Sequence, residues 1–409
     1  MGKPLEGIRI LDCTQYLSGP LTTTLLCDMG AEVIKIERPP YGDQSRFTKA
    51  VKDGYGTSFV TRNRGKKSVL MDLKDPAHKE LFLKMVKTAD MVVENNKPGV
   101  FDKMGFDFDT LRAINPAVVL VSISGFGATG PYRDRGAYDL SGQAEGGIIG
   151  ISGPDPDHPV KCGAYIADEA GGLFGCIGAL AALFDAKRTG EGRHVDASIL
   201  DGVFSLCDNY FTIYTATGEM PSPAGNHMIT IGASDDFLCK DGKRLCLVAS
   251  TDEQFGRLCV NVLNKPELAE DPRFLTTSGR AVNYMQLKPL IQEGLLKYDR
   301  DELCALLGSN DIVYGNINMM DDLLVHPQLL ARNMIAKVVY DNGVAFTTPG
   351  SPIRMSGYEN TGTYHAAELG QDTIEVLSEI EEESVLHGMF DGLIEESRAK
   401  LKDMLSEKS

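Results

Sequence analysis

The sequence contains no CxxC pair of cysteines, no close pair of histidines and no long apolar stretch. Its nine cysteines are irregularly spaced, which is typical of reduced thiols in a cytosolic protein and argues against a disulfide framework. The longest apolar stretch, 173–184, is too short to cross a bilayer about 30 Å thick as a helix. The first residues hold no apolar core of a signal peptide. We therefore expect a cytoplasmic protein.

Positive charge is also scarce, because 41 Lys and Arg residues stand against 57 Asp and Glu residues, for a formal net charge of -16. A chain this acidic is repelled by phosphate backbones and by anionic lipid, so we expect neither a nucleic-acid nor a membrane partner. A small anionic ligand is compatible with this charge, since a local basic pocket can overcome the net field. The seven histidines include no HExxH motif, so we expect no metal site.

Alternating strand and helix patterns run from the first residues to about residue 200. A chain of 409 residues with 43% hydrophobic and 24% charged residues has the size and composition of two or three globular units. The predicted strands are 7–12, 32–37, 67–72, 89–94, 118–124 and 194–199, and the predicted helices are 21–29, 79–88, 106–115 and 171–187. This alternation predicts a doubly wound α/β domain with parallel strands. A linker rich in Gly, Pro and Ser, 217–226, marks its end, and a hairpin is expected around 237–248.

A glycine-rich motif, GFGATG at 125–130, follows the predicted strand 118–124. A dinucleotide fingerprint needs a helix directly after such a motif, so that the helix N-terminus holds the pyrophosphate. Here the loop-forming sequence PYRDRG follows. We therefore favour a flexible loop near a substrate or phosphate, or a structural turn, over nicotinamide or flavin binding.

Basic residues cluster just after predicted strand ends, where open α/β sheets bind their ligands. They are Arg38, Arg46, Arg64, Lys66 and Lys67. Their positions favour an anionic, nucleotide-like ligand, whereas solvation of the surface is the alternative interpretation.

Two acids, Asp168 and Glu169, lie among small residues directly before the predicted helix 171–187. A carboxylate near a helix N-terminus is kept ionised by the helix dipole and by free N–H groups. Such a group serves either as an N-cap or, when accessible, as a nucleophile for covalent catalysis.

A series of short motifs has a characteristic order and spacing. They are GIRILD at 7–12 with SGP at 18–20, MGAEVIKIE at 29–37, GD at 42–43 with Arg46, NRGKKS at 63–68, VEN at 93–95 with PG at 98–99, SGFG at 124–127, TGP at 129–131, YD at 138–139 with QA at 143–144, and GEGRHVD at 190–196. As a set they resemble the family III CoA transferases, the group that contains formyl-CoA transferase and carnitine CoA-transferase. The resemblance covers nearly the whole chain.

The resemblance implies a ring-like, interlocked homodimer whose subunits have a Rossmann-like large domain and a small domain. We accordingly divide the chain into a large CoA-binding domain over 1–215, a linker and small α+β domain over 216–330, and a C-terminal segment over 331–409 that returns to the large domain. The implied substrates are CoA esters, an acyl-CoA donor and a carboxylic acid acceptor, with no tightly bound cofactor.

The family's functional residues carry over position by position. Its nucleophile falls on Asp168, and an acidic position near the active site falls on Asp139. The other supporting residues are Gln15, Tyr138, Gly125 and Gly127, with backbone N–H groups at Gly125, Gly127 and Gly130 as candidate oxyanion donors. The CoA contacts fall on Tyr16, Arg38, Leu70, Lys74, Asn95, Asn96 and Lys103. The implied reaction passes through an aspartyl anhydride and an aspartyl-CoA thioester at Asp168.

Two positions depart from formyl-CoA transferase. The sequence has AGNHM at 224–228 where that enzyme has a run of glycines forming a lid, and Leu17 stands where it has a Gln near the reacting centre. The chain looks closest to members that act on small carboxylates such as oxalate or formate.

Two alternative functions remain. The α-methylacyl-CoA racemases share this fold and use a His directly before the Tyr-Asp segment; here that position is Ala137, which cannot move a proton and so favours transfer over racemisation. A racemase or epimerase of this fold is thus one alternative, and a non-catalytic acyl-CoA-binding protein is the other.

Overall fold

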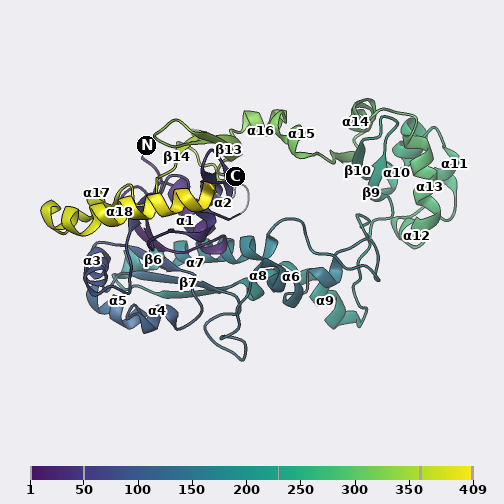
Figure 1. Ribbon diagram of the computed structural model, residues 1–409. Helices are drawn as coiled ribbons and strands as arrows, with labels where there is room; N and C mark the ends of the chain where they lie inside the picture. The colour runs from purple at the N-terminus through teal and green to yellow at the C-terminus, as the bar shows by residue number, and fades with distance from the viewer. Residues whose placement is uncertain (1, 49–50, 229, 359–361, 407–409) are drawn as a thin grey trace. The chain divides into compact units, whose positions relative to one another are not determined.

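The computed structural model describes residues 2–48, 51–228, 230–358 and 362–406, and the chain divides into two compact units (Figure 1). Unit one comprises Met1–Ile148, Cys162–Ala216 and Pro327–Ser409, and unit two comprises Ile149–Lys161 and Thr217–His326. The division proposed from the sequence kept 149–161 with the large domain. In the structure this segment pairs within unit two, where Gly225 N donates to Gly153 O at 2.7 Å.

Unit one is built on a six-stranded parallel sheet. Its strands are β1 (Arg9–Cys13), β2 (Glu32–Glu37), β5 (Lys67–Leu70), β6 (Met91–Glu94), β7 (Val119–Ser124) and β8 (His194–Ser198). They lie in the order β5-β2-β1-β6-β7-β8, and every neighbouring pair is parallel. The chain therefore leaves β1 in both directions along the sheet, which is the arrangement of a doubly wound α/β fold. The predicted parallel α/β sheet is confirmed.

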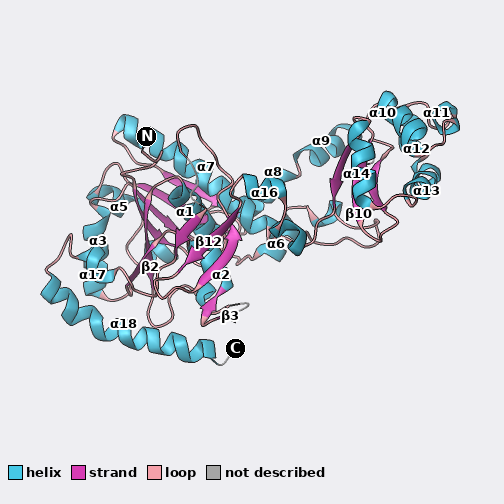
Figure 2. Ribbon diagram, turned by 90° about the horizontal axis from the view of Figure 1, so that it is seen from above, coloured by secondary structure: helices cyan, strands magenta, loops and turns pink. Residues whose placement is uncertain are grey.

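Helices cover both faces of this sheet (Figure 2). Neighbouring strand residues point to opposite faces, so that Ile10 packs with α1 (Ser18–Asp28) and α7 (Ile166–Thr189), whereas Leu11 packs in the core on the other face. The helices of that second core include α3 (Pro76–Val86), α5 (Phe108–Ile114), α17 (Thr373–Leu377) and α18 (Glu383–Ser406). The C-terminal segment thus packs on the sheet that the N-terminal residues begin.

Shorter elements complete unit one. They are η1 (Gln44–Arg46), β3 (Val51–Lys52), β4 (Tyr55–Gly56), α2 (Thr57–Asn63), α4 (Val100–Lys103), α6 (Asp139–Glu145), α8 (Ile199–Leu206), α9 (Asp208–Thr217), α16 (Pro327–Ala331), β12 (Ile335–Val339), β13 (Ala345–Pro349) and β14 (Thr363–His365). The last three form a small sheet in the order β13-β12-β14.

Unit two combines a small antiparallel sheet with helices. The sheet has the order β11-β10-β9 and consists of β9 (Ser234–Leu238), β10 (Arg244–Val248) and β11 (Val313–Asn316). Strands β9 and β10 form the predicted hairpin. The helical elements are η2 (Ile149–Ile151), α10 (Asp252–Arg257), η3 (Leu258–Val262), α11 (Glu267–Glu270), α12 (Thr277–Val282), α13 (Tyr284–Leu295), α14 (Arg300–Ser309) and α15 (Met320–Leu324).

Helix α7 is longer than the sequence predicted. Its 24 residues are long and apolar enough to cross a membrane. The expectation that the apolar segment is too short for a span is therefore wrong when the whole helix is considered. Half of the most apolar part of this helix is buried inside the unit. The helix lies so close to α1 that a Cβ at Gly172 would come within 2.6 Å of the Ser18 carbonyl oxygen. Because a buried core helix passes the same length test, this is weak evidence for a membrane span.

Candidate active site

The predicted site residues gather at one edge of the large sheet. Parallel strands place their carboxyl ends together, and Gln15 and Tyr16 follow β1, Arg38 follows β2, and Asn95 follows β6. The strand order reverses between β1 and β6, which is where open α/β sheets form their ligand crevice.

A side-chain amide joins the two loops at this reversal point. Asn95 Oδ1 accepts the Gln15 N–H at 2.8 Å, and Asn95 Nδ2 donates to the Gln15 carbonyl at 2.8 Å. The neighbouring Asn96 is held by the buried carboxylate of Glu94, which accepts its backbone N–H at 2.8 Å and its Nδ2 at 3.0 Å. Burial raises the pKa of Glu94. Both predicted asparagines are therefore fixed in place at the crevice.

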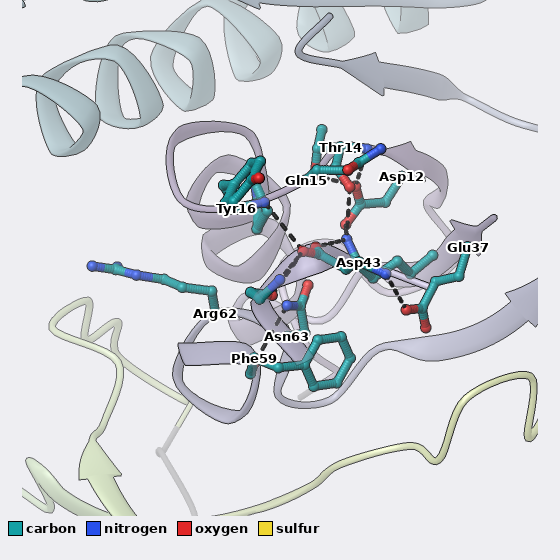
Figure 3. A network of polar contacts seen from close by, with 12 residues as sticks. Asp12, Thr14, Gln15, Tyr16, Glu37, Asp43, Phe59, Arg62 and Asn63 are labelled. Carbon is teal, nitrogen blue, oxygen red and sulfur yellow. Dashed lines mark hydrogen bonds and ion pairs between the residues drawn. The ribbon is translucent and has the colours of Figure 1, made fainter. Parts of the chain in front are cut away.

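A buried network of charges lies beneath the loop after β1 (Figure 3). Asp12 is 0% exposed and accepts from Lys66 Nζ at 2.9 Å. Lys35 Nζ lies 2.9 Å from Asp43 Oδ2 and donates to the Thr14 carbonyl at 2.9 Å. Burial disfavours ionised Asp12, but attraction to Lys35 and Lys66 outweighs burial and holds the pKa of Asp12 well below its usual range. Burial also lowers the pKa of Lys66 to about 8, although Asp12 opposes that shift.

Buried ion pairs account for three of the five basic residues that the sequence suggested would face a ligand. Arg46, Arg64 and Lys66 are 4%, 6% and 3% exposed and form ion pairs with Glu37, Asp28 and Asp12. That part of the prediction is wrong, because these cations are paired with buried carboxylates inside the unit.

Tyr16 and Tyr138 meet above the network. Tyr16 has a φ of 68°, and its N–H donates to Asp43 Oδ1 at 3.2 Å. Its ring lies edge-on to that of Tyr138, with centroids 6.4 Å apart. Tyr138 is 73% exposed and directly precedes α6. Residues 122 positions apart in the sequence thus line one surface at this edge.

Asp168 is half-buried and lies in the first turn of α7. The predicted helix began at 171, but the structure begins it at Ile166. The reason is a distant cap: the buried carboxylate of Asp139 accepts the Ala167 N–H at 3.0 Å, where the Tyr165 side chain makes no capping hydrogen bond. Asp168 is therefore not the N-cap of this helix.

Gln143 extends the same support to the loop before α7. Its side chain is 0% exposed and donates to Asp139 Oδ2 at 2.8 Å and to the Ala164 carbonyl at 3.2 Å. Its own oxygen accepts the Cys162 N–H at 2.9 Å. Helix α6 therefore holds both the approach to α7 and its first turn. In the sequence, Gln143 stands out only as part of the QA motif at 143–144.

Arg62 was missed by the sequence analysis. It lies on α2 and forms an ion pair with Glu169, the residue after Asp168. The two side chains are 19% and 29% exposed. Nothing in the local sequence links residues 107 positions apart, so only the fold reveals this pair.

The glycines after β7 are needed for close packing at Gly125 and for a positive φ at Gly127 and Gly130. A Cβ at Gly125 would lie 2.4 Å from the Ala137 Cβ, which explains the absence of a side chain there. Gly127 has a φ of 85°, and its N–H donates to Ser124 Oγ at 2.9 Å. Because that N–H already has a partner, the structure does not support Gly127 as an oxyanion donor. Gly130 also has a positive φ, 84°.

The remaining predicted CoA contacts lie on two kinds of surface. The Arg38 side chain is 61% exposed and lies 3.8 Å from Asp72, whose carboxylate also accepts the Lys74 N–H at 3.1 Å. Lys103 is exposed at the end of α4. Leu70 is different: its side chain is 0% exposed and its N–H donates to Thr373, so the structure does not bring it to the ligand surface.

A pocket of about 490 Å³ lies elsewhere in unit one. Its walls include Arg46, Tyr55, Tyr340, Glu368 and Arg398, and none of the residues carried over from the family lines it. Across the part of the chain that the structure describes, no cluster of His, Cys, Asp and Glu is arranged to hold a metal ion.

The chain is similar to known proteins over most of its length. Residues 5–373 match the model of CoA-transferase family III. The acetyl-CoA:oxalate CoA-transferase of Acetobacter aceti is 36% identical over 358 residues, which cover 87% of this chain and 90% of that protein. The succinate–glutarate CoA-transferase of Agrobacterium fabrum is 34% identical, with 92% of this chain and 96% of that protein covered.

A solved structure is also similar. The crystal structure of a CAIB/BAIF family protein from Brucella suis superposes with a TM-score of 0.83 at 34% identity. The match covers 93% of this chain and 100% of that one.

Proposed function

The chain belongs to CoA-transferase family III and is a CoA-transferase, and we propose that it moves CoA from an acyl-CoA donor to a carboxylic acid through covalent intermediates on Asp168. The observation that carries the proposal is the placement of Asp168. It is half-buried in the first turn of α7, and the buried Asp139 caps that turn at 3.0 Å. Helix-terminal N–H groups keep a carboxylate ionised, as a nucleophile must be.

The proposed reaction is a series of acyl exchanges. The Asp168 carboxylate attacks the donor thioester carbonyl, forms a mixed anhydride and releases CoA thiolate. The thiolate attacks the aspartyl carbonyl, so that the donor acid leaves and an aspartyl-CoA thioester remains. The acceptor carboxylate then attacks this thioester, forming a second anhydride and freeing the thiolate, which takes the acceptor acyl group and restores Asp168. No proton is gained or lost overall, and no electron is transferred.

The residues at the sheet edge suit the parts of CoA. Arg38, Lys74 and Lys103 are cations that would hold its phosphates by charge-assisted contacts. Asn95 and Asn96, fixed by their own hydrogen bonds, would offer preorganised polar groups to the rest of the molecule. Small dicarboxylic acids are the proposed acids, since relatives are named for oxalate, succinate and glutarate.

We further propose that the enzyme works as a homodimer. One run of helices, α7 to α9, exposes large apolar side chains, which suits burial against a second copy. They include Leu173 at 48%, Ile177 at 61%, Phe184 at 72% and Phe211 at 50% exposure. Light scattering on the purified protein should give twice the chain mass, and a monomer at micromolar concentration would refute this proposal.

The test of the proposed activity is an exchange assay read by mass spectrometry. Wild type is incubated with acetyl-CoA and a panel of mono- and dicarboxylic acids, and new CoA esters are measured. Asp168→Ala should abolish exchange, whereas Asp185→Ala, on the same helix and paired with Arg188 at 2.9 Å, should retain it. Equal activity of the two variants would refute the nucleophile. Exchange of α-hydrogen for deuterium without CoA transfer would indicate a racemase.

A further inference from the structure

We propose that Arg62 binds the second carboxylate of a dicarboxylic acid reacting at Asp168, and that Glu169 occupies this place when no acid is bound. The inference rests on the proposed function, because it assigns the far end of the acceptor at the same site. It names the residue that would distinguish a dicarboxylic from a monocarboxylic acid.

The position of Arg62 supports this role. Helix α2 carries its side chain away from the buried network beneath (Figure 3) and toward the first turn of α7, where it forms the ion pair with Glu169. At 19% exposure the guanidinium is partly desolvated, yet it can still be reached. Among the described residues, Glu169 accepts the hydrogen bond of this guanidinium, which offers five N–H donors in a planar fork.

The charge of the first turn requires such a cation. Asp168 and Glu169 both lie in this turn, and a dicarboxylate brings two further negative charges. Like charges at this distance repel one another, and the repulsion is weakly screened at a partly buried site. Arg62 is a cation that the fold places against this turn, and a guanidinium matches a carboxylate in a bidentate geometry.

Substrate binding replaces one carboxylate partner of Arg62 with another, so the guanidinium loses little electrostatic stabilisation. Glu169 keeps a favourable interaction with the α7 dipole when Arg62 turns to the substrate, because it lies in the first turn. In the unliganded enzyme the same glutamate keeps a partly buried cation paired. Asp168 and Glu169 are consecutive residues of the first turn of α7, with Cα atoms about 3.8 Å apart, so the cation that contacts Glu169 lies beside the same turn that carries Asp168.

The experiment compares acids of equal length with and without the second carboxylate. Acetyl-CoA is the donor, so that only the acceptor varies, and kcat/KM is measured for succinate against butyrate and for glutarate against pentanoate. The readout is the ratio of the two values in each pair. Arg62→Met should lower that ratio by about 10- to 100-fold, the loss expected for a charged hydrogen bond.

Three further variants keep the result interpretable. Arg62→Lys retains the charge but not the fork, and should lower the ratio less than Arg62→Met. Glu169→Gln removes the competing carboxylate and should lower KM for succinate. Arg188→Met is the matched control, because Arg188 forms an ion pair at the other end of α7, and its ratio should equal that of wild type.

Each outcome decides one question. A ratio that stays at the wild-type value in Arg62→Met would overturn the assignment. This includes an equal loss of kcat/KM for mono- and dicarboxylic acids, which indicates a merely structural pair. If Arg62→Met does not fold, an unchanged ratio in Arg62→Lys together with an unchanged KM in Glu169→Gln overturns it instead. A wild type that transfers CoA to monocarboxylic acids alone overturns this inference and the proposed choice of acids but leaves the proposed CoA transfer standing, whereas transfer to no acid refutes the proposed CoA transfer itself.

Discussion

The cap that Asp139 provides to α7 yields a quantitative prediction. Asp139→Ala removes the acceptor of the Ala167 N–H, which lies 3.0 Å from the carboxylate, and the partner of Gln143, at 2.8 Å. Loss of an N-cap costs about 1 kcal/mol. Loss of a buried hydrogen bond to a charged group costs about 1.5–3 kcal/mol more. We therefore expect the free energy of unfolding of unit one to fall by about 3 kcal/mol.

The same substitution should reduce activity by more than the loss of stability alone would cause. Asp168 is the residue after Ala167, so a first turn that frays displaces the nucleophile, and kcat should fall at saturating substrate under conditions where the variant is fully folded. Asp139→Asn keeps an acceptor for Ala167 but presents an amide donor to Gln143, so its effects should be intermediate. Urea denaturation followed by circular dichroism gives the stability, and the exchange assay gives kcat.

Asp107→Ala is the matched control. Asp107 caps α5 through the Thr110 N–H at 2.9 Å, so its loss should lower stability by about 1 kcal/mol and leave kcat unchanged. The reasoning is refuted if Asp139→Ala and Asp107→Ala retain the same kcat.

Other residues give further predictions. Lys66→Met leaves the buried carboxylate of Asp12 without its 2.9 Å partner and should lower the free energy of unfolding by about 3–5 kcal/mol in urea titrations, with much of the loss recovered by adding Asp12→Asn. The folded-state pKa of Asp12 is held below its unfolded value of about 4. The contribution of ionised Asp12 to the free energy of unfolding is therefore complete above about pH 4 and should disappear as the pH falls through the folded-state pKa. Acid unfolding of wild type and of Asp12→Asn will test this. Asn95→Ala removes both hydrogen bonds to the Gln15 backbone, and we expect KM for acetyl-CoA to rise about tenfold and the free energy of unfolding to fall by about 1–3 kcal/mol.

Local patterns were sufficient to predict the sheet. Strand β2 runs from Glu32 to Glu37, as predicted, because its apolar residues and the glycine before it mark a short buried strand. The parallel order followed from the alternation with helices, and it brought Gln15 and Asn95 to one edge. These features depend on neighbours in the sequence.

Long-range partners could not be predicted in this way. The first turn of α7 depends on Asp139, which lies 28 positions before Ala167, so the predicted start of the helix was late. Arg46 resembled a ligand-binding cation in sequence, yet Glu37 accepts two of its N–H groups within the core. Whether a charge meets a ligand or a buried partner is decided by the packing of distant segments.

The most direct test of the account is the mass of the enzyme itself. After incubation with acetyl-CoA, wild type should gain an acetyl group or CoA, and peptide mapping after borohydride reduction should find the Asp168 carboxyl converted to an alcohol. Asp168→Asn should show neither change. An adduct on another residue, or CoA transfer at the wild-type rate with no adduct on Asp168, would contradict the account.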